Sequence, residues 1–227
     1  MKALCRLGVL LVTLTYGPFL DAQSIPFDSS IEVQLFEPAL GPHAFLTVDG
    51  AAVVGKREFR LSLLLTYLTN PLTVYLVDNN QQITTTRASV VESMLGGLLY
   101  GAYVIARGMQ VGVVVPLVLA MNGEGLDPNT AMPTTGLSVR GISDVRLEFA
   151  YRLYESGAIS IAAIPALTLP TSTSLGSPDQ WLGDNVPTLR PRVAAEWQHK
   201  SGKLAAAANL GVLLRKPREL YSSQVGS

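Results

Sequence analysis

The stretch Ser143-Asp-Val-Arg-Leu-Glu-Phe-Ala-Tyr-Arg-Leu153 decides the fold, because apolar and polar residues alternate along it. In an extended chain, one face would carry Val145, Leu147, Phe149, Tyr151 and Leu153, and the other Asp144, Arg146, Glu148, Ala150 and Arg152. A β-strand turns successive side chains to opposite faces, so this stretch predicts a strand with one apolar and one charged face. A soluble sandwich also alternates, so the prediction depends on how often the pattern recurs.

The composition is apolar but does not predict membrane helices. Hydrophobic residues make up 48% of the 227 residues and charged residues 15%, against roughly 25% charged residues in soluble domains. The mean hydropathy is +0.31. The longest apolar run after the amino terminus, Val111 to Met121, contains Gly112 and Pro116 and falls short of the roughly 18 residues that a spanning helix needs. This combination predicts strands that face lipid, and the net charge of zero gives no reason to expect nucleic acid.

Residues 1–22 have the layout of a secretory signal peptide. Lys2 and Arg6 flank the start of an apolar core, Leu7 to Leu14, and cleavage is expected after Ala22. The single cysteine, Cys5, would leave with this segment, which excludes disulfides and thiolate metal sites from the mature chain. We therefore expect residues 23–227 to form one exported β domain.

The alternating pattern recurs at nearly every other predicted strand. The predicted strands cover residues 31–35, 44–54, 57–68, 89–105, 109–119, 143–153, 158–169, 186–198 and 204–215. In the second of these, the expected outward residues are Leu46, Val48, Ala52 and Val54. Predicted long loops at 69–87, 120–142 and 170–185 alternate with short turns, as in outer-membrane barrels. The sequence thus predicts an all-β fold, an antiparallel transmembrane β-barrel of about eight to ten strands.

The faces opposite the apolar rows carry charges of both signs. The predicted lumen-facing polar ladder consists of Glu58, Arg60, Glu92, Asp144, Arg146, Glu148, Arg152, Arg190, Arg192, Glu196, Asn209 and Arg215. Ion pairs among them would plug a narrow barrel, because pairing avoids the cost of burying a lone charge. The same residues would also suit the constriction of a water-filled pore. Both interpretations stay open, because strand number and tilt set the bore.

We find no pattern that predicts catalysis. The two histidines, His43 and His199, lie beside predicted turns without ligand-like spacing. Carboxylates such as Glu92, Asp144 and Glu148 lie on a face rich in arginine, where ion pairing is the expected role. No nucleophile elbow, phosphate loop or zinc motif occurs in the sequence. We therefore expect no enzymatic activity, no cofactor and no metal.

Several short motifs resemble the amino-terminal barrel of a group of OmpA-family outer-membrane proteins. The motifs are Leu35-Phe-Glu-Pro-Ala39, Tyr67-Leu-Thr-Asn-Pro-Leu72, Val111-Gly-Val-Val-Val-Pro-Leu117, Gly141-Ile-Ser-Asp-Val-Arg146, Leu167-Thr-Leu-Pro-Thr171, Leu182-Gly-Asp184, Leu189-Arg-Pro-Arg192 and Asn209-Leu-Gly211. The Leu-Pro-Thr element is also similar to barrels linked to the transport of aromatic compounds, although Ser172 stands where a glycine usually follows.

The chain departs from the OmpA-family pattern in two ways. We expect no peptidoglycan-binding domain within these 227 residues, and the sequence ends Ser-Ser-Gln-Val-Gly-Ser227, without the terminal aromatic residue that such barrels usually present to the barrel-assembly machinery. The predicted strand count is also odd, whereas bacterial single-chain barrels have even counts. These departures raise the expectation of an amino-terminal part of a larger barrel.

Three functions are compatible with these patterns. The first is a non-enzymatic protein of the cell outer membrane with a structural or envelope role and weak passive permeability. The alternative is an outer-membrane channel for small apolar or aromatic solutes. A second alternative is a secreted, soluble β-sandwich binding module. The first two predict outer-membrane lipid and the barrel-assembly machinery as partners, and the channel adds a small-molecule solute.

Overall fold

The computed structural model describes residues 36–41, 45–53, 57–77, 83–126, 134, 136–176, 182–183, 186–215, 218–220 and 223–225. The predicted signal peptide and the predicted strand at 31–35 lie outside these residues. The strands are β1 (Phe59–Val77), β2 (Ile83–Ala106), β3 (Met109–Gly123), β4 (Leu137–Ile142), β5 (Val145–Ser156), β6 (Ile159–Leu169), β7 (Thr173–Gly176), β8 (Thr188–Gln198), β9 (Ala205–Gly211), β10 (Leu214–Arg215), β11 (Arg218–Leu220) and β12 (Ser223–Val225). The prediction of an all-β fold is confirmed. No described residue belongs to a helix long and apolar enough to cross a membrane.

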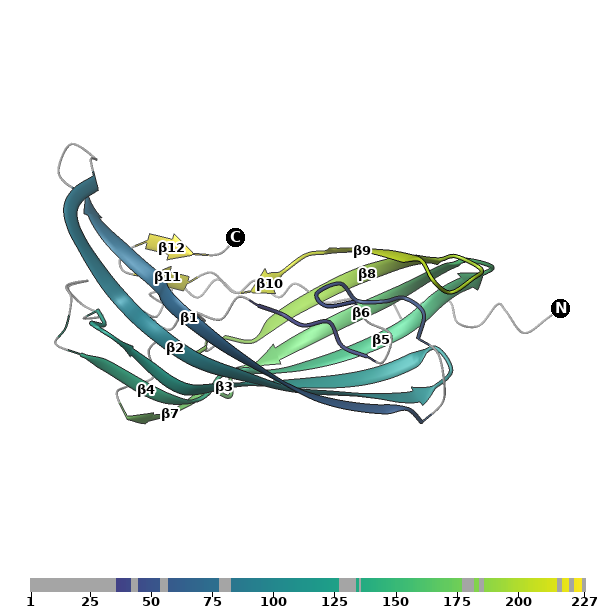
Figure 1. Cartoon of the computed structure of the whole chain (residues 1–227), viewed down its shortest axis with the longest axis horizontal. Coiled ribbons are helices and arrows are strands. Elements are labelled where there is room, and N and C mark those ends of the chain that lie inside the picture. Colours follow the sequence, from purple (N-terminus) through teal and green to yellow (C-terminus); the bar gives the residue numbers. More distant parts are fainter. Residues whose placement is uncertain are drawn as a thin grey trace, which may run out of the picture.

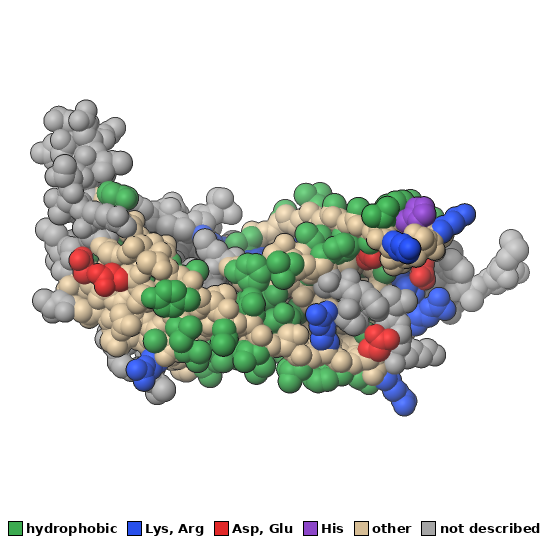
Figure 2. Space-filling model, viewed as in Figure 1, with side chains coloured by type: hydrophobic (Ala, Val, Ile, Leu, Met, Phe, Trp, Pro, Cys, Tyr) green, Lys and Arg blue, Asp and Glu red, His purple; other side chains and the backbone are tan. Residues whose placement is uncertain are grey.

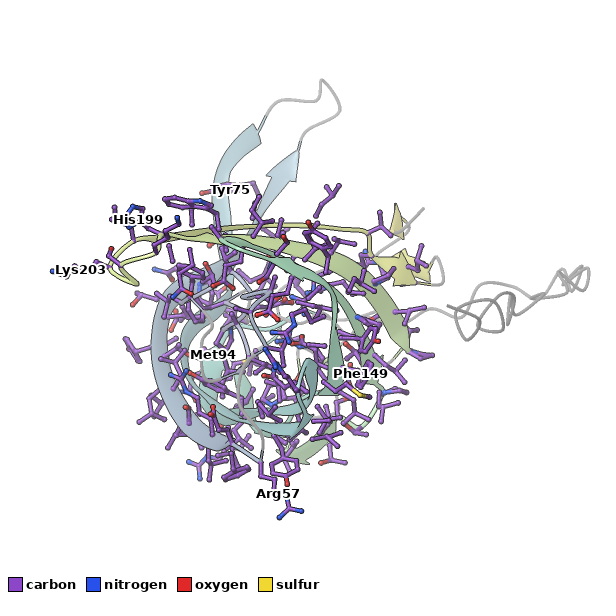
Figure 3. All side chains as sticks on the ribbon, turned by 90° about the vertical axis from the view of Figure 1, so that its right-hand side faces the viewer. Arg57, Tyr75, Met94, Phe149, His199 and Lys203 are labelled. Carbon is purple, nitrogen blue, oxygen red and sulfur yellow. The ribbon has the colours of Figure 1, made fainter. Side chains whose placement is uncertain are left out.

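One antiparallel sheet curls around the interior of the molecule (Figures 1 and 3). Its strands follow the order β1-β2-β3-β5-β6-β8, and both β9 and β10 pair with the far side of β8. The sheet is not closed, because β1 pairs with neither β9 nor β10 within the described residues. Neighbouring strands alternate in direction along this order, so β1 and β9 run the same way. They could not pair as antiparallel neighbours.

Two breaks divide what would otherwise be longer strands. β4 and β5 both pair with β3 and are separated by Ser143 and Asp144, and β6 and β7 are separated by residues 170–172. The Asp144 carboxylate joins the two breaks, because its Oδ1 accepts the backbone N–H groups of Thr171 and Ser172, each at 3.1 Å. The Thr171 hydroxyl in turn accepts the N–H of Val145 at 2.9 Å. The two breaks are therefore held together by side chains that lie in the breaks, those of Asp144 and Thr171.

The predicted loops 69–87, 120–142 and 170–185 are wrong over much of their length. β1 and β2 continue to Val77 and from Ile83, and β4 and β7 form a pair within the other two predicted loops. Asn70-Pro71 does not end β1, because the register shifts between Thr69 and Leu72 and leaves these two residues outside the ladder. A bulge accommodates a proline that has no N–H to donate. The turn signal was present, but it marked a bulge within a strand.

A proline also accounts for the divided last strand. Pro191 in β8 accepts a hydrogen bond from the N–H of Val212 at 3.2 Å, so this residue faces the β9–β10 edge. Having no N–H, Pro191 cannot return the bond. The pairing breaks there, between Gly211 of β9 and Leu214 of β10, where one continuous strand, 204–215, was predicted.

The two faces of the sheet follow the predicted alternation. The outward rows hold exposed apolar residues, among them Leu147 at 42% and Val193 at 48% exposure, and Figure 2 shows such side chains across the middle of the molecule. Inward residues such as Ile164 and Ala194 are fully buried. The buried residue Met94 lies inside the ring of strands in Figure 3. The sheet thus presents apolar side chains outward and encloses a packed interior.

Candidate functional site

A segment that belongs to no strand fills the middle of the curled sheet. We call it the plug segment: residues 36–41 and 45–53. Figure 1 shows it in purple between the β1–β3 and β6–β8 parts of the sheet. At one end Leu40 packs against a cluster on β2 and β3, and at the other Ala51 and Val53 pack against Val104, Ala150, Ala162, Ile164 and Ala194. The predicted strand at 44–54 is therefore wrong. The predicted alternation is nevertheless present, because Asp49, expected on the face opposite the outward residues, is buried, as are Ala51 and Val53 at the same spacing.

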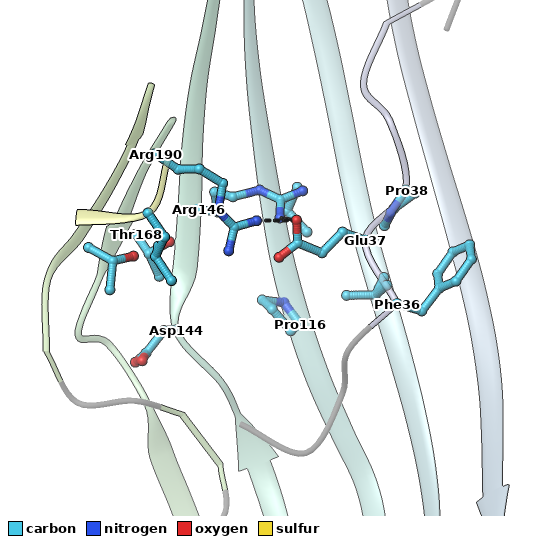
Figure 4. Close-up of a pocket in the computed structure, with 12 residues that line it drawn as sticks. Phe36, Glu37, Pro38, Pro116, Asp144, Arg146, Thr168 and Arg190 are labelled. Carbon is cyan, nitrogen blue, oxygen red and sulfur yellow. Dashed lines mark hydrogen bonds and ion pairs between the residues drawn. The ribbon is translucent and has the colours of Figure 1, made fainter. Parts of the chain in front are cut away.

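The first polar contact of the plug segment is a carboxylate between two arginines. Glu37 forms ion pairs with Arg146 of β5, at 3.1 Å, and with Arg190 of β8 (Figure 4). Burial raises the pKa of the Glu37 carboxyl, but the hydrogen bond from Arg190 and the charges of Arg146, Arg190 and Arg192 outweigh it and leave the pKa below its usual value. Arg146 is nearly buried, and its Nε has no hydrogen-bond partner.

A second carboxylate, Asp49, completes a buried cluster. Arg192 of β8 pairs with Asp49 at 2.8 Å and with Glu148 of β5, while Asn209 of β9 donates its Nδ2–H to Asp49 at 3.0 Å. Burial raises the pKa of the Asp49 carboxyl, and the nearby Arg192 offsets this only in part. Gly211 of β9 permits the Arg192 side chain to lie close to the β9 backbone, since a Cβ at position 211 would meet that side chain at 2.5 Å. Arg192 therefore forms ion pairs with two buried carboxylates, Asp49 and Glu148.

Backbone groups of the plug segment are also held by side chains from the wall. Glu196 of β8 accepts the N–H groups of Ala51 and Ala52 at 2.8 and 2.9 Å. Arg60 of β1 donates to the carbonyl of Gly41 at 2.8 Å. Because the segment lacks a strand neighbour, these contacts replace the ladder that would otherwise satisfy its backbone.

The structure brings together only part of the predicted polar ladder. Arg60, Arg146, Glu148, Arg190, Arg192, Glu196 and Asn209 contact the plug segment or one another. Asp144 is buried but holds the break between strands, and Arg152 pairs with Glu155 beside a turn. Glu58 and Glu92 are exposed, and Arg215 is half-buried. Among the described residues, no group of three or more His, Cys, Asp or Glu side chains could hold a metal.

A small cavity of about 60 Å³ lies beside the Glu37 carboxylate. Its lining combines apolar side chains with hydroxyl-bearing and charged ones, including Leu98, Val114, Leu213, Thr168, Thr188 and Asp144. This space holds about two water molecules, whereas a cavity that binds benzene is about 150 Å³. With the plug segment in place, this space beside Glu37 is too small for an aromatic solute.

Comparison with known proteins gives the family. Residues 69–218, which are 150 of the 227, match the model of the family described as "Putative MetA-pathway of phenol degradation". The chain belongs to this phenol-degradation family. Neither a curated protein nor a solved structure matches the chain. The resemblance to OmpA-family barrels has no match of its own and stays a prediction.

The matched region of the phenol-degradation family divides the candidate site. Arg146, Arg190 and Arg192 lie within it, whereas their partners Glu37 and Asp49 precede it. Several motifs that carried the sequence resemblance also meet in space: Asp144 contacts Thr171 and Ser172, and a Cβ on Gly183 would meet the Asp144 carboxylate at 2.6 Å. Most of the wall and both breaks thus fall within the family's region, whereas residues 59–68 of β1 and the described plug segment precede it.

Sequence reasoning missed the two carboxylates of the plug segment. Glu37 follows the predicted strand at 31–35, and Asp49 was placed on a strand of its own. The usable signal was on the charged face of the 186–198 stretch, where two arginines, Arg190 and Arg192, accompany the single acid Glu196, because buried arginines require acidic partners. His199, expected to be a polar residue near a turn, contacts the Ser201 hydroxyl at 2.8 Å, and His43 lies outside the described residues.

Proposed function

We propose that this protein is a non-enzymatic β-barrel of the cell outer membrane that admits small aromatic solutes, such as phenols, to the cell. Membership of the phenol-degradation family supports the solute class. Exposed rows of Leu, Val and aromatic residues on the outside of a curled sheet support the location, because such rows suit lipid tails. Exposed Tyr103, Tyr151 and Trp197 would suit the interface with lipid head groups.

The observation that carries the proposal is the contrast between wall and filling. The wall is a continuous hydrogen-bonded sheet, whereas the interior is filled by a segment without strand pairing, held by side-chain contacts at Glu37, Asp49 and Ala51–Ala52. Side-chain contacts can be released one at a time without breaking the sheet. We propose that solute passes when the plug segment moves, and that the wall remains intact.

Phenol consumption by intact cells tests this function. The full chain would be expressed in a bacterium that has an outer membrane and cytoplasmic phenol-degrading enzymes. We expect faster phenol consumption by intact cells at low phenol concentration and equal consumption by lysates, because lysis removes the barrier. A gain in lysates would instead indicate an enzyme. Equal rates in intact cells with and without the protein would contradict the proposal.

A second function, that of a structural barrel whose interior stays permanently plugged, is favoured by the ion pairs that fill the interior. Outer-membrane fractionation, followed by unheated and heated gel samples, tests the location shared by both functions. Recovery of the protein in the soluble periplasmic fraction would contradict both. Conductance in planar bilayers then separates them, because discrete channel steps are incompatible with a permanently plugged barrel.

A further inference from the structure

We propose that Arg146 and Arg190 form a binding site for the carboxylate of a monoaromatic acid, and that Glu37 of the plug segment occupies this site in the absence of ligand. The inference rests on the proposed function in that solutes must be able to enter the interior. It adds aromatic carboxylates to the proposed solutes, since a neutral phenol offers no charge to these two arginines.

The geometry of the two arginines is that of an anion site. Their side chains come from different strands, β5 and β8, and converge on one carboxylate (Figure 4). Guanidinium groups bind carboxylates through charge-assisted hydrogen bonds, most strongly when two donors engage one carboxylate. Arg146 reaches Glu37 through Nη1, while its buried Nε has no partner. A carboxylate placed by a free ligand, without the constraint of the chain, could engage both donors.

The occupant is a removable part of the molecule. Glu37 lies on the plug segment outside any strand, and its side chain is 38% exposed, whereas that of Arg146 is only 11% exposed. An exposed side chain on an unpaired segment can withdraw while the arginines remain fixed in the sheet. Withdrawal would leave two cationic groups without this acid, which favours replacement by another carboxylate.

The surroundings of the pair favour an aromatic acid over a small one such as acetate. Phe36, adjacent to Glu37, packs against the buried cluster that contains Leu98 and Val114, and these two residues also line the cavity beside Glu37. Figure 4 shows the Phe36 ring directed away from the two arginines, so the ring of a ligand would take the cavity that Leu98 and Val114 line, joined to the space that the Glu37 side chain leaves when it withdraws. The hydroxyls of Thr168 and Thr188 line the same cavity and suit polar ring substituents.

Calorimetric titration of the purified full chain in detergent, at neutral pH, tests the site. The probes are benzoate, benzyl alcohol, which has a ring but no charge, and acetate, which has the charge but no ring. We expect Glu37→Gln to lower the Kd for benzoate about tenfold, because it removes the competing charge. Under the same change, the Kd for benzyl alcohol should move less than about twofold. Arg190→Gln should weaken benzoate binding by about tenfold or more.

Glu155→Gln is the matched control. It makes the same change in net charge, but Glu155 pairs with Arg107 and Arg152, beside the turn between β5 and β6, rather than with the arginines that hold the plug segment. Benzoate binding should not change in this variant. The proposal is overturned if Glu37→Gln leaves the benzoate Kd unchanged, if both Glu→Gln variants change it equally, or if acetate binds as tightly as benzoate. Because Glu37 lies outside the sheet, this arm does not depend on whether Arg190→Gln folds.

The two proposals can fail separately. Faster phenol consumption by intact cells, together with no effect of Glu37→Gln on benzoate binding, would retain the proposed function and remove the carboxylate site. Specific benzoate binding with no gain in phenol consumption would retain the site and remove passage of phenol. Only the titration bears on the roles of Arg146 and Arg190.

Discussion

Strand β8 and the plug segment show the same alternation of side chains but are held in different ways. In β8 the inward residues Thr188, Ala194 and Glu196 are buried, and its backbone pairs with β6 on one side and β9 or β10 on the other. In the plug segment Asp49 and Ala51 are buried at the same spacing, yet the backbone is held by side chains such as Glu196.

The difference shows what a period of two reports. A period of two indicates that an extended segment has one buried face. It does not distinguish a strand in the wall, whose buried face points into the interior, from a segment inside the wall, whose buried face is covered by the sheet. A wall strand is stabilised by its ladder and its packing together, whereas the plug segment has no ladder and depends on a few polar contacts and on the packing of Leu40, Ala51 and Val53. Changes at those contacts should therefore act on the plug segment before they act on the wall.

The largest effect is expected for Arg192→Met. Arg192 is the ion-pair partner of both Asp49 and Glu148, whose side chains are each 3% exposed. Removing one member of a buried ion pair costs about 3–5 kcal/mol, because the remaining charges stay buried. Urea titration of the protein folded in lipid vesicles measures this loss. The triple change with Asp49→Asn and Glu148→Gln should recover much of it, and a failure to recover would mean that Arg192 acts through packing alone.

A charge on the outer face should cost nearly as much. Leu147→Arg places a cation on the apolar outside of β5, where the expected cost is about 2–4 kcal/mol near the bilayer midplane. The inward change Arg190→Gln should cost less, because its partner Glu37 is partly exposed. The same urea titration compares the two variants. Equal tolerance of both would mean that the outer face of the sheet does not contact lipid.

The sequence predicted the wall well because the wall depends on local alternation. The outward and inward residues of 143–153 and 186–198 agree with β5 and β8, and the short turn at Gly157 lies between β5 and β6. The ends of strands and the breaks within them were harder to predict, because Asn70-Pro71 signals a bulge as readily as a loop.

Only the arginines of the candidate site could be predicted from the sequence, and their acidic partners could not. The arginines Arg146, Arg190 and Arg192 were on the predicted inward faces, but their partners depend on where residues 36–53 run in space. No local pattern specifies that path, because Glu37 and Arg190 are separated by 153 residues of chain. The nine predicted strands included 31–35, which lies outside the described residues, and 44–54, which is not a strand, so the predicted count does not describe the wall. Within the described residues the sheet order leaves β1 without a closing partner.

An intermediate effect is expected at the backbone anchor of the plug segment. Glu196→Ala removes the acceptor for the N–H groups of Ala51 and Ala52, and hydrogen bonds to a charged group contribute about 1.5–3 kcal/mol. Maleimide labelling of Ala52→Cys, in a Cys5→Ser background, should become faster in this variant, since the segment leaves the wall more often. Gln198→Ala on the same strand is the control and should leave the rate unchanged. Equal labelling rates in all three proteins would mean that Glu196 is not needed and that the Asp49–Arg192 ion pair and the apolar contacts of Ala51 and Val53 hold this end.

The smallest effect is expected from mild acid at the other anchor. The pKa of Glu37 lies below its usual 4.5, because Arg190 and Arg146 outweigh the effect of burial. A carboxyl with a lowered pKa contributes stability that is present above its ordinary pKa and is lost as the pH falls through the lowered value. A fluorophore on Leu46→Cys, a position with 74% exposure, should therefore report little movement at pH 6 or pH 5 and release of the plug segment only below about pH 4.5. The difference between this protein and the same protein with Glu37→Gln isolates Glu37 from Asp49, whose pKa is raised. A transition above pH 5 that persists in the Glu37→Gln variant would mean that another group controls acid release. The contact between Glu37 and the two arginines would then not hold this end of the plug segment to the wall.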